Sequence, residues 1–83
     1  MSTETATVAN VEEHAVQRRP EIGRQIRAAR SNKGWTQART AQYLGCSRRR
    51  VNRVERGMTD LSVFELELLA QVFDVPVSFF LEQ

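Results

Sequence analysis

The tripeptide Gly45-Cys46-Ser47 most limits the folds open to this chain, because it separates two short segments that each have a helical pattern. Gly45 can adopt the positive φ of a tight turn, and Cys46 is small enough to fill the corner between two helices. Ser47 can begin the next helix by accepting a hydrogen bond from a free backbone N–H. The spacing predicts helices over about 37–44 and 48–56, joined by a turn that is typical of a helix-turn-helix.

The two predicted helices differ in their polarity. The first begins at Thr36 as N-cap and has an apolar side made of Ala38, Ala41 and Leu44. In the second, only Val51 and Val54 have the spacing of inward-facing residues. The rest of that helix carries five arginines, namely Arg48, Arg49, Arg50, Arg53 and Arg56. Because these would repel one another in an isolated helix, local stability does not explain their presence.

Further helical segments lie on both sides of this pair. Pro20 suits the first turn of a helix over about 20–33, and Gly34 suits its left-handed end. Ser62 and Glu65 have the spacing of a capping box at the start of a fourth helix. The apolar positions that we expect to be buried in these two helices are Ile22, Ile26, Ala29, Leu66, Leu69, Ala70 and Phe73, with Phe64 and Leu68 widening the stripe of the fourth helix.

The end of the chain predicts one more element. Val75-Pro76 interrupts the fourth helix, because the residue before a proline disfavours the helical conformation. Val77, Phe79, Phe80 and Leu81 then form a final apolar turn or a short fifth helix. We expect an all-α fold with five helices, in a helix-turn-helix domain over 20–83 that follows a flexible N-terminal arm over 1–19.

Composition excludes several classes of protein. The chain has 83 residues, of which one is a cysteine and one a histidine, so we expect no disulfide, no metal site, no cofactor and no catalytic set. No apolar run approaches the ~18 residues of a membrane span. The N-terminus has no basic and apolar pattern of a secretory signal. We expect a cytoplasmic protein that is not an enzyme.

Charge is strongly segregated along the chain. All 12 lysines and arginines lie between residues 18 and 56, where Glu21 and Glu55 are the acidic residues, and both flanking regions are acidic. This pattern favours a polyanionic partner for the middle of the chain. A solvated charged surface is the simpler alternative, and the excess of arginine over lysine could reflect a GC-rich genome. A GC-rich genome does not explain why every basic residue lies between residues 18 and 56.

These segments, in this order, resemble the lambda and 434 repressor-like helix-turn-helix family, also called the Cro/C1 or XRE type. The similarity runs from about Ile22 to Leu81. The residues that carry it are Ile22-Gly23-Arg24, Ile26-Arg27, Arg30, Gly34-Trp35-Thr36-Gln37, Ala41, Leu44-Gly45-Cys46-Ser47, Val51, Val54-Glu55-Arg56-Gly57, Leu69-Ala70 and Phe73-Asp74-Val75-Pro76. Two positions depart from the family: Thr40 stands where leucine is usual, which we expect to weaken packing, and Leu61 stands where proline is common.

The resemblance implies a role for each matching residue. Arg48, Arg49 and Arg53 match the positions that contact bases, where an arginine favours guanine because it donates two hydrogen bonds to O6 and N7. The implied phosphate contacts are Thr36, Gln37, Arg50, Asn52 and Arg56. Arg30 and Glu55 match a structural ion pair, although Glu55 could also be an ordinary exposed acid.

Other residues have structural interpretations. We expect Cys46 to be a buried filler rather than a redox switch. We expect the aromatic side chains to be core or dimer contacts rather than platforms for single-stranded nucleic acid; they are Trp35, Phe64, Phe73, Phe79 and Phe80.

The resemblance implies a sequence-specific, double-stranded DNA-binding regulator of transcription, and a repressor in particular. It also implies a bacterial or phage protein that is associated with the nucleoid when bound to DNA. We expect a homodimer on an inverted repeat that contacts its second copy through about Val75 to Leu81, with monomers that meet only on DNA as the alternative. A second hypothesis is an antitoxin-like or adaptor protein that binds a protein partner, and a C-terminal sensor domain could be missing from this chain. RNA is disfavoured, because its narrow major groove does not admit such a helix.

Overall fold

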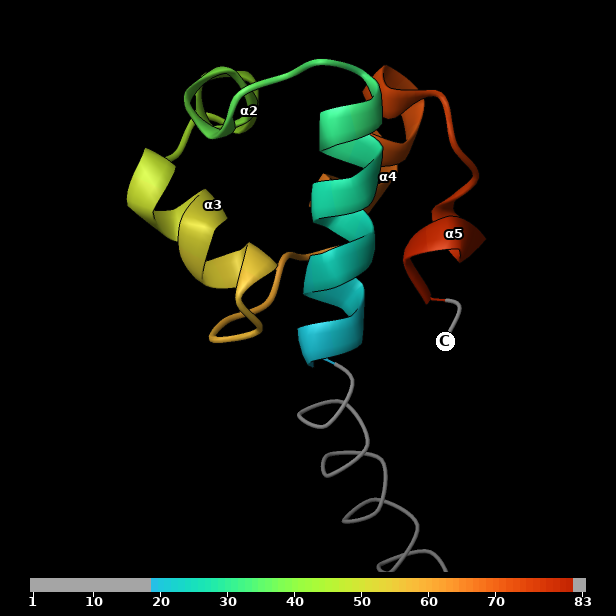
Figure 1. The fold of residues 1–83 in the computed structure, drawn as a ribbon, viewed down its shortest axis with the longest axis horizontal. Helices are drawn as coiled ribbons and strands as arrows, with labels where there is room; N and C mark the ends of the chain where they lie inside the picture. Colours follow the sequence, from blue (N-terminus) through green and yellow to red (C-terminus); the bar gives the residue numbers. More distant parts are fainter. Residues whose placement is uncertain (1–18, 82–83) are drawn as a thin grey trace, which may run out of the picture.

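The computed structural model describes residues 19–81, which form five helices and no strand (Figure 1). The first helix covers residues 19–32 of the described part. The four helices after it are α2 (Gln37–Leu44), α3 (Arg48–Glu55), α4 (Val63–Phe73) and α5 (Val77–Leu81). In Figure 1 the first helix runs through the middle of the domain, with α2 and α3 on one side and α4 and α5 on the other. The expected all-α class is confirmed.

The predicted N-terminal arm lies outside the described residues except for its last position. Arg19, which we assigned to the arm, is helical in the structure. Its guanidinium donates to both carboxylate oxygens of Asp60, at 2.9 and 2.8 Å. This contact attaches the start of the described helix to the loop between α3 and α4.

Side-chain caps define where three of the helices begin. The hydroxyls of Thr36, Ser47 and Ser62 each accept a hydrogen bond from the backbone N–H three residues later, at 3.0 to 3.1 Å. Ser62 also donates its backbone N–H to the Glu65 side chain, which completes the predicted capping box. All three predicted N-caps are confirmed, and the first turn of each helix has a partner for donors that the helix itself cannot satisfy.

The hydrophobic core forms where the first helix meets α3, α4 and α5. Leu69 of α4 and Phe80 of α5 are completely buried, and Ile26 of the first helix is 1% exposed. The remaining members of this cluster are Ala29, Val54, Leu66, Ala70 and Phe73. The predicted buried stripes of the first and fourth helices therefore pack against each other, and α5 covers one side of them.

Two predicted core positions are wrong. Phe64 was expected to widen the buried stripe of α4, yet it is 67% exposed. With 3.6 residues per turn, Phe64 lies on the opposite side of α4 from Leu66. Ala38 was expected on the buried side of α2, but it is exposed, and Thr40 and Ala41 are buried instead.

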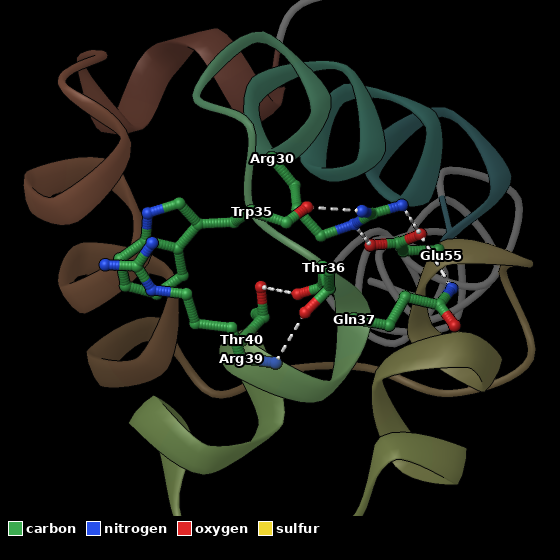
Figure 2. A network of polar contacts seen from close by, with 7 residues as sticks. All are labelled: Arg30, Trp35, Thr36, Gln37, Arg39, Thr40 and Glu55. Atoms are coloured by element: carbon green, nitrogen blue, oxygen red, sulfur yellow. Dashed lines mark hydrogen bonds and ion pairs between the residues drawn. The ribbon is translucent and has the colours of Figure 1, made fainter.

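Thr40 fits its buried position without an unpaired polar group. Its side chain is 0% exposed, and its hydroxyl donates to the carbonyl oxygen of Thr36 at 3.0 Å (Figure 2). A buried hydroxyl is costly only when it lacks a hydrogen-bond partner. The departure from the family's leucine at this position therefore leaves no unsatisfied donor in the core.

Gly23 allows the first helix to touch the end of α3. A Cβ atom at this position would lie 2.5 Å from the carbonyl oxygen of Val54 and 2.6 Å from that of Glu55. Both are backbone atoms, so they cannot move aside as the end of a long side chain can. The close approach of these two helices therefore requires a residue without a side chain.

We predict that Gly23→Ala lowers the free energy of unfolding by about 1–3 kcal/mol, although the same change at an open helical site raises helix stability. Chemical denaturation measures the change. Ser31→Ala, at an exposed position of the same helix, is the matched control and should stay within about 0.5 kcal/mol of the wild type. A Gly23→Ala protein as stable as this control would show that the helices can separate without cost.

An ion pair connects α3 to α4. The guanidinium of Arg50 donates to both carboxylate oxygens of Glu65, at 2.5 and 2.9 Å. These hydrogen bonds, against the opposing effect of burial, lower the pKa of the Glu65 carboxyl to about 2, and the Ser62 backbone N–H contributes in the same direction. The pKa of Arg50 is raised in turn, chiefly by the same contact.

We predict a pH-dependent contribution from this pair. Because the folded-state pKa of Glu65 lies below the ordinary value of 4.5, the stabilisation is present above about pH 4.5 and is lost as the pH falls towards 2. Glu65→Gln retains a side chain suited to the capping box but removes the charge, so it should cost about 1 kcal/mol at pH 7 after allowance for solvent screening.

Thermal denaturation of the wild type and of Glu65→Gln from pH 7 to pH 2 tests this pH dependence. The difference in Tm should shrink across the acidic range, and a difference that is the same at every pH would show that the charge of Glu65 is not involved. Glu21→Gln, which removes the partner of Arg24 in an exposed pair at 3.4 Å, is the control and should change Tm little.

Candidate nucleic-acid interface

The turn between α2 and α3 has the geometry of a helix-turn-helix. Gly45 adopts a left-handed conformation with φ of 71°, and its N–H donates to the carbonyls of Ala41 and Gln42. The N–H of Cys46 also donates to the carbonyl of Ala41, at 2.9 Å. Ala41 itself is 3% exposed. The chain therefore leaves α2 and enters α3 through a closed, hydrogen-bonded turn, and Cys46 is half-buried in its corner.

The faces of α3 are sharply divided. Val51 and Val54 are each 3% exposed and face the rest of the domain. Arg49, Arg53 and Arg56 have the i, i+4 and i+7 spacing that places them together on the opposite face. Only a narrow stripe of α3 packs against the rest of the domain, and the outward side of α3 is cationic.

A buried ion pair joins the first helix to α3 (Figure 2). Arg30 donates to Glu55 through Nε at 2.6 Å and through Nη2 at 3.1 Å, and its Nη1 donates to the carbonyl of Trp35 at 2.7 Å. The side chains of Arg30 and Glu55 are only 13% and 3% exposed. Glu55 is therefore not an ordinary exposed acid, and its charge has a partner inside the domain.

Gln37, the first residue of α2, belongs to the same network. Its Nε2 donates to Oε1 of Glu55 at 3.0 Å. Figure 2 shows Glu55 between Arg30 and Gln37, so that one carboxylate contacts side chains from two other helices. Because a carboxylate only accepts hydrogen bonds, the amide nitrogen of Gln37 must face it. The orientation of the Gln37 amide follows from this contact.

Several of the basic side chains already have partners within residues 19–81. Arg19, Arg24, Arg30 and Arg50 each pair with a carboxylate. The guanidinium of Arg39 lies over the Trp35 ring, 4.1 Å from its centre. The basic side chains that have no ion pair or side-chain hydrogen bond to other described residues are Arg27, Lys33, Arg48, Arg49, Arg53 and Arg56.

The structure separates the predicted site residues into two groups. Arg48 and Arg49 are exposed on the first turn of α3, and Arg53 is half-buried one turn later. Arg50 is instead turned towards α4, where Glu65 holds two of its nitrogens. Thr36 uses its hydroxyl to cap α2.

One residue of the candidate interface was not among the site residues predicted from the sequence. Arg27, on the first helix, lines a pocket together with the predicted residues Gln37, Asn52 and Arg56. The sequence did contain a signal for it, because Arg27 precedes Arg30 by three residues and therefore lies near the same helix face.

The aromatic side chains have mainly structural contacts. Trp35 packs edge-on against Tyr43 and Phe73, with ring centres 5.7 and 5.5 Å apart. It therefore links α2 to α4. Phe79 and Phe80 form a similar contact at 5.9 Å. Within residues 19–81, no helix combines the length and the apolar character needed to cross a bilayer.

Comparison with known proteins identifies the family. A sequence model of the helix-turn-helix family matches residues 26–80. An uncharacterized HTH-type transcriptional regulator from Sinorhizobium medicae is 31% identical over 61 residues, which is 74% of this chain and 44% of that protein. The competence pilus inhibition repressor of Acinetobacter baylyi is 36% identical over 58 residues, which is 70% of this chain and 53% of that protein. The chain spans about half the length of these curated relatives.

Comparison with solved structures supports the same family. The crystal structure of the restriction-modification controller protein C.AhdI from Aeromonas hydrophila superposes with a TM-score of 0.65 at 30% sequence identity. The match covers 74% of this chain and 92% of that one. The family model covers residues 26–80, which include most of the described helices and make up well over half of the sequence. The chain therefore belongs to the helix-turn-helix family, in the Cro/C1 type that its sequence resembles.

Proposed function

We propose that this chain binds double-stranded DNA in a sequence-specific manner and regulates transcription, with α3 in the major groove. The observation that carries the proposal is the outward face of α3, where Arg48, Arg49 and Arg53 have no partner among residues 19–81. An α-helix fits the major groove, which is about 12 Å wide, and residues near its N-terminus can reach the base edges. A repressor role is supported by the relative from Acinetobacter baylyi, which is named as a repressor.

The roles proposed for individual residues follow from their positions. Arg48, Arg49 and Arg53 contact bases, and they favour guanine because a guanidinium donates two parallel hydrogen bonds to it. The residues that contact backbone phosphates are Thr36, Gln37, Asn52 and Arg56, with Arg50 as a weaker member. Arg50 is weaker because Glu65 already accepts hydrogen bonds from two of its nitrogens.

We propose that the protein acts as a homodimer in the cytoplasm. One domain of this size contacts only a few base pairs, and two copies would contact half-sites about 34 Å apart. The segment from Val75 to Leu81 is the proposed contact, since Phe79 is only half-buried and Leu81 is 42% exposed there. Phe80 does not take part, because it is fully buried in its own domain.

A protein partner is the second candidate function. Val63 and Phe64, adjacent at the start of α4, are 71% and 67% exposed. Exposed apolar pairs of this kind are typical of contact surfaces when they form part of a larger patch. In that case, binding of the partner would persist after Arg48 and Arg49 are replaced.

Selection of bound duplexes from a random library tests the primary proposal. We expect a guanine-containing inverted repeat with half-sites about 10 base pairs apart, preferred about 10³-fold or more over scrambled DNA. Binding that depends on salt but enriches no sequence would show that the arginines supply electrostatic attraction alone, and would favour the protein-partner function.

We predict that Arg49→Ala and Arg56→Ala have different effects. Arg49→Ala should weaken binding to the selected duplex by about 1–3 kcal/mol and affect scrambled DNA less, because it removes contacts to a base. Arg56→Ala should weaken both and reduce the slope of log K against log salt by about one, because it removes a contact to a phosphate. Titration of both duplexes at two salt concentrations measures both effects. Equal losses on both duplexes for Arg49→Ala would remove it from the base contacts.

A further inference from the structure

A polar pocket lies where the first helix meets the start of α2 and the end of α3. Its lining residues are Arg27, Arg30, Gln37, Asn52, Glu55 and Arg56. They come from three different helices, which the Arg30–Glu55–Gln37 network already holds together (Figure 2). Three arginines and one glutamate leave this pocket with an excess of positive charge.

We infer that this pocket binds one phosphate of the DNA backbone and that Arg27, on the first helix, is a direct phosphate contact. The inference rests on the proposed DNA-binding function and adds to it a contact from the first helix, outside the helix-turn-helix pair. It assigns Arg27 and Arg56 as the charged contacts and Asn52 as a neutral one.

Glu55 does not oppose an anion in this pocket, because its oxygens are already occupied. Arg30 donates to both of them and Gln37 donates to Oε1. The side chain of Glu55 is 3% exposed. The negative charge at the base of the pocket is therefore neutralised by Arg30, and the charges that remain are those of Arg27 and Arg56.

Arg27 and Arg56 are both exposed, and neither has an ion pair or side-chain hydrogen bond among the described residues. They approach the pocket from different helices, so they could contact different oxygens of the same anion. A guanidinium donates to a phosphate in a bidentate geometry, which neutral side chains cannot match. Asn52 adds two amide donors from α3.

A backbone phosphate fits this position better than a base does. Arg56 lies on the outward face of α3 with Arg49 and Arg53, whereas Arg27 lies beside that helix. When α3 occupies the groove, a pocket beside it faces the sugar-phosphate strand that borders the groove. A phosphate held there would fix the orientation of α3 relative to the bases.

Replacement of single phosphates tests the inference directly. Duplexes of the selected sequence would carry one neutral methylphosphonate at successive positions, and their affinities would be measured for the wild type, Arg27→Ala and Arg24→Ala. Arg24 is the matched control because it is exposed on the same helix, is paired with Glu21 and does not line the pocket. The melting temperature of each variant shows that it is folded.

We expect one methylphosphonate position in each half-site that lowers wild-type affinity about tenfold and has a smaller effect in Arg27→Ala, where Arg56 and Asn52 remain as contacts to that phosphate. Arg27→Ala should also lose a similar factor on selected and scrambled DNA, and its salt slope should fall by about 0.9. Arg24→Ala should respond to the methylphosphonates as the wild type does.

The inference is overturned if Arg27→Ala has the same affinity, salt slope and methylphosphonate pattern as Arg24→Ala. If that result comes with the expected loss of specificity in Arg49→Ala, the proposed function stands and only the phosphate pocket is lost. If the wild type selects no duplex at all, both the function and the pocket are rejected.

Discussion

The buried ion pair between Arg30 and Glu55 is the contact on which the arrangement of this domain depends. Glu55 is at the end of α3, Arg30 is on the first helix, and Gln37 at the start of α2 donates to the same carboxylate. A charge removed from water is costly unless it is paired and hydrogen-bonded. The three helices can therefore adopt few other arrangements, because moving any one of them would leave a charged or polar group in the interior without its partner.

Close packing of the first helix against the end of α3 supports this ion pair. Gly23 brings the first helix against the backbone carbonyls of Val54 and Glu55, and a side chain at this position would push the helices apart. On the other side of α3, Arg50 and Glu65 connect it to α4. Three helices thus hold α3, while its remaining face carries the arginines that have no partner in the described part of the chain. Four carboxylates of the described part pair with other arginines and leave this face cationic; they are Glu21, Glu55, Asp60 and Glu65.

Much of the fold could be predicted from the sequence because its signals are local. Caps at Thr36, Ser47 and Ser62, and the left-handed break at Gly45, depend on a few adjacent residues. Phe64 is exposed although its hydrophobicity favours burial, because its position two residues before Leu66 puts it on the opposite face of α4.

The candidate site was less predictable because its residues acquire partners only in the folded chain. Nothing in the arginine run distinguishes Arg50 from its neighbours, yet its place on α3 directs it towards Glu65. Arg27 is distant in sequence from Asn52 and Arg56, and only the packing of the first helix against α3 brings them to one pocket. The assignment of residues to bases and phosphates remains a prediction.

The free energy of unfolding of Glu55→Ala tests the central claim most directly. Loss of the carboxylate leaves Arg30 buried without its charge partner, and a loss of about 3–5 kcal/mol is expected on that basis. Glu21→Ala, which removes an acid from an exposed pair, should change the same quantity by less than about 0.5 kcal/mol. A Glu55→Ala protein as stable as Glu21→Ala would contradict the account, because the three helices would then be held in place without their shared carboxylate.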